Sequence, residues 1–270
     1  MLNKINTHIA YNRLIPSTQY GFRPGVNTET QITDLVIKIT ESFNYSPICV
    51  DLIFIDFSNA FDSVSHSILL NKLYNMGIRG TFIKLLGSFL DNRKAYVKYN
   101  STKSKLMEIN SGTPQGSKIS PTLYSLYVSD LVEAVNNSNL YQFADDSVIV
   151  KVIKNESDQL LLQSDLNNIF NWCKSNNLKI NPSKSVHMRF SLIKTNKTEY
   201  EINGVPIETK DHHKHLGVII DNKMTFNLNT ESIVNKALKK WSMVKRICKS
   251  VNGALFLKLY KTYFAIIGIL

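Results

Sequence analysis

Two apolar segments that meet aspartates at their ends constrain the fold of this chain more than any other feature. Residues 48–57, ICVDLIFIDF, form an apolar, β-branched run that predicts a strand buried on both faces, with Asp56 near its end. Residues 140–153 predict two strands joined by a tight turn that carries Asp145 and Asp146. If these strands are neighbours in one sheet, the three carboxylates converge at one end of it.

The rest of the chain predicts an α+β fold in which helices cover this sheet. After a turn-rich opening loop, residues 32–39 repeat apolar side chains at helical spacing, and Thr28 or Thr30 is the expected cap. Further helices are expected over residues 67–76, 81–90, 121–135 and 162–173, and further strands over residues 94–100, 105–110, 185–190, 200–202 and 215–220. Residues 1–220 therefore form the predicted α+β body, and residues 221–270, helical from Asn227, a second piece.

Composition limits the classes of protein and the compartment. The chain has 270 residues and is 43% hydrophobic, enough for a substantial core, and its net charge of +11 favours polyanions or an anionic membrane surface. No apolar run reaches the roughly 20 residues of a membrane helix, and the start does not resemble a signal peptide. Cys49, Cys173 and Cys248 lie far apart, which indicates neither a disulfide framework nor a cysteine zinc site. A reducing, intracellular setting is the simplest expectation.

The three aspartates suit phosphoryl transfer by two metal ions. That chemistry needs carboxylates from separate strands to hold two divalent cations about 4 Å apart. Oxygen ligands favour Mg²⁺ or Mn²⁺ over Zn²⁺. The alternative is that Asp145 and Asp146 form an ordinary solvated turn. The apolar runs on both sides of the pair favour a functional role, because acids placed there are costly without one.

Phe61 follows Asp56 by five residues, where the chain turns from strand toward helix. A ring beside the metal site would exclude the 2′-hydroxyl of a nucleotide, since a phenyl edge offers that hydroxyl no hydrogen bond. The alternative interpretation is a core aromatic.

Three further segments are candidates for substrate contacts. SGTPQGSKISP, residues 111–121, predicts a shaped loop in which Gln115 and Gly116 meet nucleotide or template, although a plain connection is the alternative. Arg23 in GFRPG and Lys184 in LKINPSKS are candidates for the triphosphate, and Lys184 also for proton donation to pyrophosphate. The alternative for each of these cations is an ordinary solvated side chain, which is the usual state of exposed arginine and lysine.

The last helices carry a basic face that fits a phosphate backbone, or a solvated amphipathic helix. Its members are Lys236, Lys239, Lys240, Lys245, Arg246 and Lys249, with Trp241 among them. Three histidines, His212, His213 and His215, are expected in a loop before a strand instead of a zinc site, because no cysteine or spaced acid pair is near.

Taken together and in order, these blocks resemble the reverse transcriptase domain of non-LTR, LINE-type retrotransposons, most like the jockey-related branch. The resemblance runs from about Leu14 to the end of the chain. The strings that carry it are QYGFRPGVNTETQI, FIDFSNAFDSV, SGTPQGSKISPTLYSLYVSDL, YQFADD, LKINPSKS and HLGVIID.

The resemblance implies a right-hand polymerase of fingers, palm and thumb, with an antiparallel palm sheet covered by helices. It assigns the metals to Asp56, Asp145 and Asp146, the sugar gate to Phe61, nucleotide and template contacts to Arg23, Gln115 and Gly116, and a primer-gripping turn to Leu216 and Gly217. Lys236 and Lys240 are the expected backbone contacts of the thumb. The family has a fingers segment before the GFR block, so the chain is expected to be truncated at both ends, with residues 1–220 as fingers and palm and 221–270 as partial thumb.

The implied activity is RNA-templated DNA synthesis from a DNA primer and deoxynucleoside triphosphates. Its setting by resemblance is target-primed insertion in the nucleus, and no membrane contact is expected. Two alternatives remain open: a catalytically inactive, nucleic-acid-binding remnant, and an RNA-dependent RNA polymerase, which Phe61 disfavours. Protein partners cannot be read from the sequence.

Overall fold

The computed structural model describes residues 2–44, 49–193 and 198–247, together with residues 253, 255, 257, 258 and 261. The chain forms two compact units, Met1–Lys210 and Asp211–Leu270. Residues of the predicted elements that lie outside the described residues include Ile48, the first residue of the predicted strand 48–57, and Cys248 and Lys249 of the predicted last helix.

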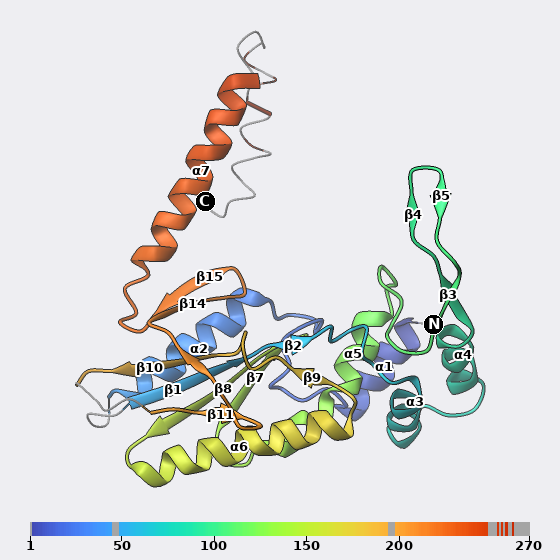
Figure 1. The fold of residues 1–270 in the computed structure, drawn as a ribbon, viewed down its shortest axis with the longest axis horizontal. Coiled ribbons are helices and arrows are strands. Elements are labelled where there is room, and N and C mark those ends of the chain that lie inside the picture. Colours follow the sequence, from blue (N-terminus) through green and yellow to red (C-terminus); the bar gives the residue numbers. More distant parts are fainter. Residues whose placement is uncertain are drawn as a thin grey trace. The chain divides into compact units, whose positions relative to one another are not determined.

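A five-stranded sheet forms the centre of the first unit (Figure 1). Its order is β13 (Glu208–Thr209), β10 (Val186–Ser191), β1 (Cys49–Ile55), β8 (Asp146–Ile153) and β7 (Asn139–Phe143). All neighbours are antiparallel except β10 and β13. Every residue of β1 is buried, which confirms the strand expected from the apolar run. The two strands with an acidic turn between them are confirmed as β7 and β8.

Helices pack on both faces of the sheet, so each face has its own apolar layer (Figure 1). On one face, α6 (Glu156–Ser175) buries Leu162, Leu166 and Ile169 against β1 and β8 side chains such as Ile53. On the other, α2 (Thr28–Ser42) buries Leu35 and Ile39 and contacts β7. Both helices were expected.

The cap of α2 differs from the expected one. Asn27, not Thr28 or Thr30, is the N-cap, and its side chain accepts a hydrogen bond from the Thr30 backbone N–H at 2.8 Å. Thr30 completes a capping box, because its hydroxyl oxygen accepts from the Asn27 N–H at 3.4 Å.

The opening of the chain is a helix, α1 (Leu2–Asn12), so the expected opening loop is wrong there. Ile5 is buried in the main core, and the His8 Nε2 lies 2.8 Å from the Met76 carbonyl oxygen. These contacts with distant residues stabilise a segment whose own sequence has no acidic first turn or basic last turn.

The helices α3 (His66–Asn75) and α4 (Thr81–Leu90) confirm the expected pair. The single helix expected over residues 121–135 is wrong in its second half. It divides into α5 (Ser120–Tyr127) and a 3₁₀ helix, η1 (Ser129–Ala134). Lys72 explains the break, because its ammonium donates to the Tyr127 carbonyl at 2.7 Å and also to Asp130 at 2.6 Å.

The remaining strands of the first unit are short. The expected hairpin is confirmed as β3 (Arg93–Ala95) with β6 (Met107–Ile109) and β4 (Lys98–Tyr99) with β5 (Thr102–Lys103). Two more pairs are β2 (Phe57–Ser58) with β9 (Lys179–Ile180) and β11 (Glu201–Ile202) with β12 (Val205–Pro206).

The second unit contains a hairpin and a helix. Strands β14 (His212–His215) and β15 (Val218–Asp221) replace the expected loop and single strand. A two-residue turn makes this possible, since Leu216 and Gly217 have φ of 46° and 91°. Helix α7 (Asn227–Ile247) confirms the helical pattern from Asn227. Among the described residues, no helix is long and apolar enough to span a membrane.

A buried charged network joins β1 to β10. The carboxylate of Asp51, fully buried on β1, accepts from Arg189 at 2.7 and 2.6 Å and from the Tyr200 hydroxyl at 2.6 Å. His187 lies 3.3 Å away on the same carboxylate and 3.0 Å from the Thr209 hydroxyl. Burial alone would raise the pKa of Asp51, but hydrogen bonds from Arg189, His187 and Tyr200 outweigh it and lower the pKa below its usual value.

We expect Asp51→Asn to lower the free energy of unfolding by about 3–5 kcal/mol, because it leaves the Arg189 charge uncompensated in the interior. Because the folded-state pKa of Asp51 is lowered, its contribution is present above the unfolded pKa and is lost as the pH falls through the folded value. Urea unfolding at pH 7 and pH 3 measures both effects. The exposed pair of Glu208 with Lys210 gives the control Glu208→Gln, whose effect should stay within about 0.5 kcal/mol. An equal loss in both variants would contradict the prediction.

Candidate active site

The register of the sheet brings the three aspartates together. Ile55 lies opposite Ser147 in the antiparallel pair of β1 and β8, so the next positions along, Asp56 and Asp146, are neighbours at the strand ends. Burial raises the pKa of Asp146, and the charges of Asp145 and Asp56 raise it further. Carboxylates from two adjacent strands therefore crowd one another.

A divalent cation fits this donor set. Among the described residues, no lysine, arginine or histidine forms an ion pair with Asp56, Asp145 or Asp146, so no protein cation there offsets the like charges. Hard oxygen ligands prefer Mg²⁺ or Mn²⁺. Across the described residues, no three His, Cys, Asp or Glu side chains are already gathered closely enough to form a metal-ligand group. The aspartates are thus near one another and electrostatically coupled, but they are not preassembled as a ligand shell.

The backbone of Asp56 is hydrogen-bonded to the turn of residues 181–185. The Asn181 N–H donates to the Asp56 carbonyl oxygen at 2.8 Å, and the Asp56 N–H donates to the Ser185 hydroxyl oxygen at 3.2 Å. Ser185 is fully buried and donates in turn to the Asn181 carbonyl at 2.9 Å. Lys184 belongs to this turn and has an exposed side chain, so the backbone brings it to the same end of the sheet as Asp56.

The turn that carries Asp145 has an unusual backbone. Ala144, the residue before it, has φ of 57°, a left-handed conformation that costs a non-glycine residue about 1–2 kcal/mol. The N–H of this buried alanine donates to the Gln19 Oε1 at 3.0 Å. Gly21 lies against the same turn, because a Cβ on it would fall 2.4 Å from the Ala144 nitrogen. The segment before Phe22 is therefore the support of the acidic turn.

Phe61 lies between two other rings. Its ring stacks on Tyr124 with centroids 4.3 Å apart, and Phe22 approaches it edge-on at 6.4 Å. Burial raises the pKa of Tyr124, and the charges of Asp145 and Asp146 contribute to the shift, which places this ring close to the acids. Tyr124 therefore links the predicted gate to the carboxylates.

The loop with Gln115 is fastened to the segment around Phe61. The Thr113 N–H donates to the Phe61 carbonyl at 3.0 Å, and Gly112, with φ of 81°, packs so closely that a Cβ would lie 2.8 Å from the Asp62 Cα. Gln115 is exposed, with its amide 3.4 Å from the Asp62 carboxylate. Gly116, at φ of 80°, follows in the same turn and is also exposed.

Arg23 makes contacts that the sequence did not predict. One guanidinium nitrogen donates to the carbonyls of Pro16, Ser17 and Gln19, at 3.4, 3.1 and 3.1 Å. Arg23 thus organises its own loop, and its contact with a triphosphate stays a prediction.

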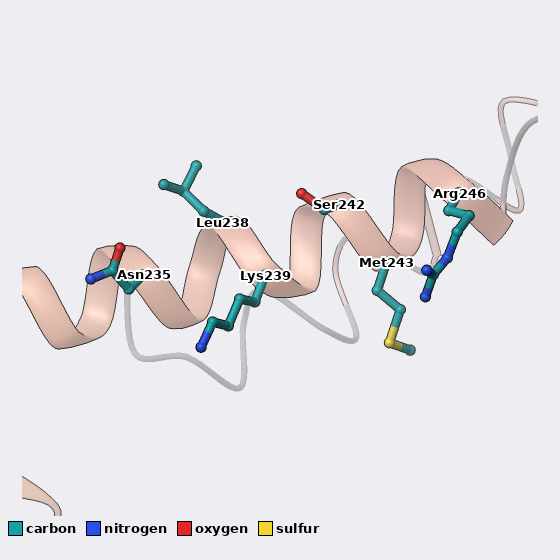
Figure 2. Close-up of a pocket in the computed structure, with 6 residues that line it drawn as sticks. All are labelled: Asn235, Leu238, Lys239, Ser242, Met243 and Arg246. Carbon is teal, nitrogen blue, oxygen red and sulfur yellow. The ribbon is translucent and has the colours of Figure 1, made fainter.

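The remaining candidates belong to the second unit. Leu216 and Gly217 form the β14–β15 turn, while Lys236 is exposed and Lys240 half-buried on α7. Figure 2 shows Lys239, Met243 and Arg246 extending to one side of α7 and Leu238 to the other, which mixes basic and apolar groups along this helix. The predicted contacts of Lys236 and Lys240 with primer or template stay predictions.

Sequence reasoning missed three supporting residues. Gln19, Tyr124 and Ser185 each contact a site segment far away in the chain. Gln19 and Tyr124 lie inside conspicuous blocks, QYGFR and SPTLYSLY, but nothing in the spacing of those blocks distinguishes their side chains from neighbouring ones. Their roles depend on which segments meet in space.

The central, mainly antiparallel sheet, its helical covering and the acids at one end of it define a right-hand polymerase. Solved structures support this fold. Telomerase from Candida tropicalis, truncated from its C-terminal domain, superposes with a TM-score of 0.58 at 12% identity, covering 84% of this chain and 44% of the telomerase chain. A second structure of telomerase from this organism, in complex with a fragment of telomeric RNA, gives a TM-score of 0.56 at 14% identity, covering 97% of this chain and 46% of that chain.

The family model for reverse transcriptase (RNA-dependent DNA polymerase) matches residues 1–220, and the chain belongs to this family. Similar proteins in Drosophila melanogaster include the probable RNA-directed DNA polymerases from transposon X-element, 30% identical over 93% of this chain, and from transposon BS, 28% identical over 90%. The RNA-directed DNA polymerase from mobile element jockey of Drosophila funebris is 30% identical over 86%. The chain spans only 26–28% of the length of these relatives. The resemblance to the jockey-related branch is confirmed.

We expect Asp145→Asn to raise the Tm of the protein in EDTA. The folded-state pKa of Asp146 is raised, so the stability associated with this group is lost as the pH rises through that value, and at pH 7 the ionised acids oppose folding. Removing one neighbouring charge relieves the repulsion. The expected rise in Tm is only roughly 1–2 °C, because these groups are partly screened by solvent. Differential scanning calorimetry checks this, with the exposed Asp91→Asn as the control. A lower Tm for Asp145→Asn in EDTA would contradict the repulsion.

Proposed function

We propose that this chain carries the polymerase site of a non-LTR retrotransposon reverse transcriptase and extends a DNA primer along an RNA template with deoxynucleoside triphosphates. The observation that carries the proposal is the convergence of Asp56 with Asp145 and Asp146, in a chain of the reverse transcriptase family, without a described protein cation to neutralise them. The relatives that match this chain are longer proteins. The proposal therefore concerns the polymerase step and not the template, insertion site or protein partners of a whole retrotransposon protein.

Asp56, Asp145 and Asp146 would hold two divalent ions, Mg²⁺ or Mn²⁺. Bound there, the ions supply charge stabilisation for the attacking 3′-hydroxyl and the leaving pyrophosphate. The strand ends fix the directions from which these carboxylates approach, and the turns of residues 181–185 and 143–146 limit their movement. Burial raises the pKa of Asp146, and the charges of Asp145 and Asp56 raise it further. A cation between the acids would offset this repulsion, so the repulsion favours cation binding.

The residues around the acids define where the nucleotide lies. Phe61 closes the sugar side of the site and is supported by the Tyr124 ring. Gln115 and Gly116 occupy an exposed turn beside this ring and would contact the nucleotide or the template base. Arg23 and Lys184 would approach the phosphates, with Lys184 as a proton donor to pyrophosphate.

The second unit would contact the nucleic acid. Leu216 and Gly217 form a tight turn of the kind that grips a primer strand, and Lys236 and Lys240 supply positive charge for the phosphate backbone. Residues 221–270 would then be part of the thumb. An intracellular, nuclear setting follows from target-primed insertion, which is proposed here through the family alone.

Primer extension tests the function. On poly(rA) with an oligo(dT) primer, we expect dTTP to be incorporated with Mg²⁺ or Mn²⁺, and the product to disappear with EDTA and in Asp145→Asn. Replacement of one metal-ligand carboxylate should lower the rate by at least about 10²-fold. A folded protein that binds the duplex but extends nothing would instead be an inactive, nucleic-acid-binding remnant. Equal use of UTP and dTTP would contradict selection of deoxynucleotides.

We expect Phe61→Val to raise the incorporation of UTP relative to dTTP by about 10–100-fold, because the ring that excludes the 2′-hydroxyl is gone. Phe61→Tyr keeps a ring in this position and is the matched control, with the ratio close to that of the unsubstituted protein. Single-nucleotide insertion with each substrate measures the ratio. A fall of both rates in parallel would mean that Phe61 only supports the core.

A further inference from the structure

We infer that Gln19 is a positioning residue that holds the backbone of the turn before Asp145, one of the proposed metal ligands. The inference deepens the proposed function, since it concerns the same aspartates. It rests on a hydrogen bond and a close backbone approach between residues 19–21 and a turn more than a hundred residues later in the chain.

The first contact is a double hydrogen bond made by a single oxygen. Gln19 Oε1 accepts from the Ala144 N–H at 3.0 Å and from the Gly21 N–H at 2.9 Å. Both donors are backbone groups, so the amide oxygen and not the amide nitrogen must face them. Gln19 is fully buried and Ala144 is nearly so, hence neither N–H has water as a substitute.

The second point is that Ala144 needs this support. Its φ of 57° is a conformation that an L-residue rarely keeps unless its surroundings hold it there. Phe143 and Asp146 close the hairpin on either side, which leaves Ala144 and Asp145 as the two turn residues. A relaxation of Ala144 would reorient the next residue, Asp145.

The third point is that Gln19 is itself firmly held. The residues before and after Gln19 both form backbone hydrogen bonds with Gln142 of β7. The Gln142 N–H donates to the Thr18 carbonyl and the Tyr20 N–H donates to the Gln142 carbonyl, both at 2.8 Å. Tyr20 also donates its hydroxyl to Asp34 at 2.7 Å. Arg23 ties the Gln19 carbonyl to the same loop at 3.1 Å. The oxygen that meets Ala144 is therefore part of a segment held by several hydrogen bonds.

Gly21 completes the support from the other side. A Cβ at this position would lie 2.4 Å from the Ala144 nitrogen and 3.1 Å from the Phe143 carbonyl carbon, both of which are backbone atoms of the turn. Close backbone approach is possible only for glycine here. Gln19 thus holds the turn by a hydrogen bond, and Gly21 holds it by close packing against its backbone.

The test compares Gln19→Met with Gln19→Glu. Methionine has nearly the same length but no comparable acceptor, whereas glutamate keeps an oxygen for both N–H groups. The matched control is Gln31→Met, because Gln31 is equally buried and no described group hydrogen-bonds to its side chain. The first readout is the affinity for Mn²⁺ alone, measured by electron paramagnetic resonance of the free ion, and the second is the split of kcat and KM in dTTP insertion.

We expect Gln19→Met to weaken Mn²⁺ binding by about 10–100-fold, as for other groups that orient metal ligands, and to lower kcat while KM for dTTP changes little. Gln19→Glu should bind Mn²⁺ within about threefold of the unsubstituted protein, and Gln31→Met should show no change. Unchanged Mn²⁺ affinity in Gln19→Met, an equal loss in Gln31→Met, or no Mn²⁺ binding by the unsubstituted protein would each overturn the inference.

Failure of the proposed function gives a different result. If the unsubstituted protein binds Mn²⁺ but extends no primer, and Gln19→Met still loses Mn²⁺ affinity, the positioning role stands while polymerase activity does not. If primers are extended equally well by Gln19→Met with its Mn²⁺ affinity intact, polymerase activity stands and the positioning role fails.

Discussion

The antiparallel pairing of β1 with β8 is the constraint on which the rest of the structure depends. Its register places the end of β1 beside the start of β8, so Asp56 and Asp146 lie at adjacent strand ends. A shift of one residue would move every side chain of the strand to the opposite face and separate the acids. The register is secured by burial of all seven β1 residues and by the Asp51 network, which links β1 to β10 away from the acids.

Around this pairing, the chain supports each strand end with a separate turn. Behind Asp56, the buried Ser185 hydroxyl links two backbone segments, and behind Ala144, the Gln19 amide oxygen does the same. Both arrangements act on the backbone, at Asp56 in one case and at Ala144, next to Asp145, in the other. Neither provides a cation, and among the described residues no protein cation pairs with the carboxylates. Such a site is unfavourable as it stands and becomes favourable with a cation. The three clustered carboxylates therefore lower the stability of the folded protein at the place where the proposed chemistry needs them.

Much of the fold was predictable because it is recorded in local patterns. The β1 segment is a continuous apolar run, the β7–β8 hairpin is two apolar runs around an acidic turn, and the α6 stripe repeats every 3.6 residues, and each was found where its pattern indicated. The failures have a common cause. Helix α1 depends on the burial of Ile5 and the contact of His8 with Met76, and the break after α5 depends on Lys72, 55 residues before Tyr127. No local pattern contains these contacts.

The sequence by itself determined the inventory of the site: Asp56 at the end of a buried strand, the Asp145–Asp146 turn, Phe61 nearby, and an order of blocks that resembles a reverse transcriptase. Only the tertiary structure decided what supports these groups. The Gln19 oxygen reaches Ala144 across 125 residues, and Tyr124 of α5 stacks on Phe61, which lies in the turn region between β2 and α3. Periodicity reports which face of an element is buried, but it carries no information on which distant side chain lies against that face.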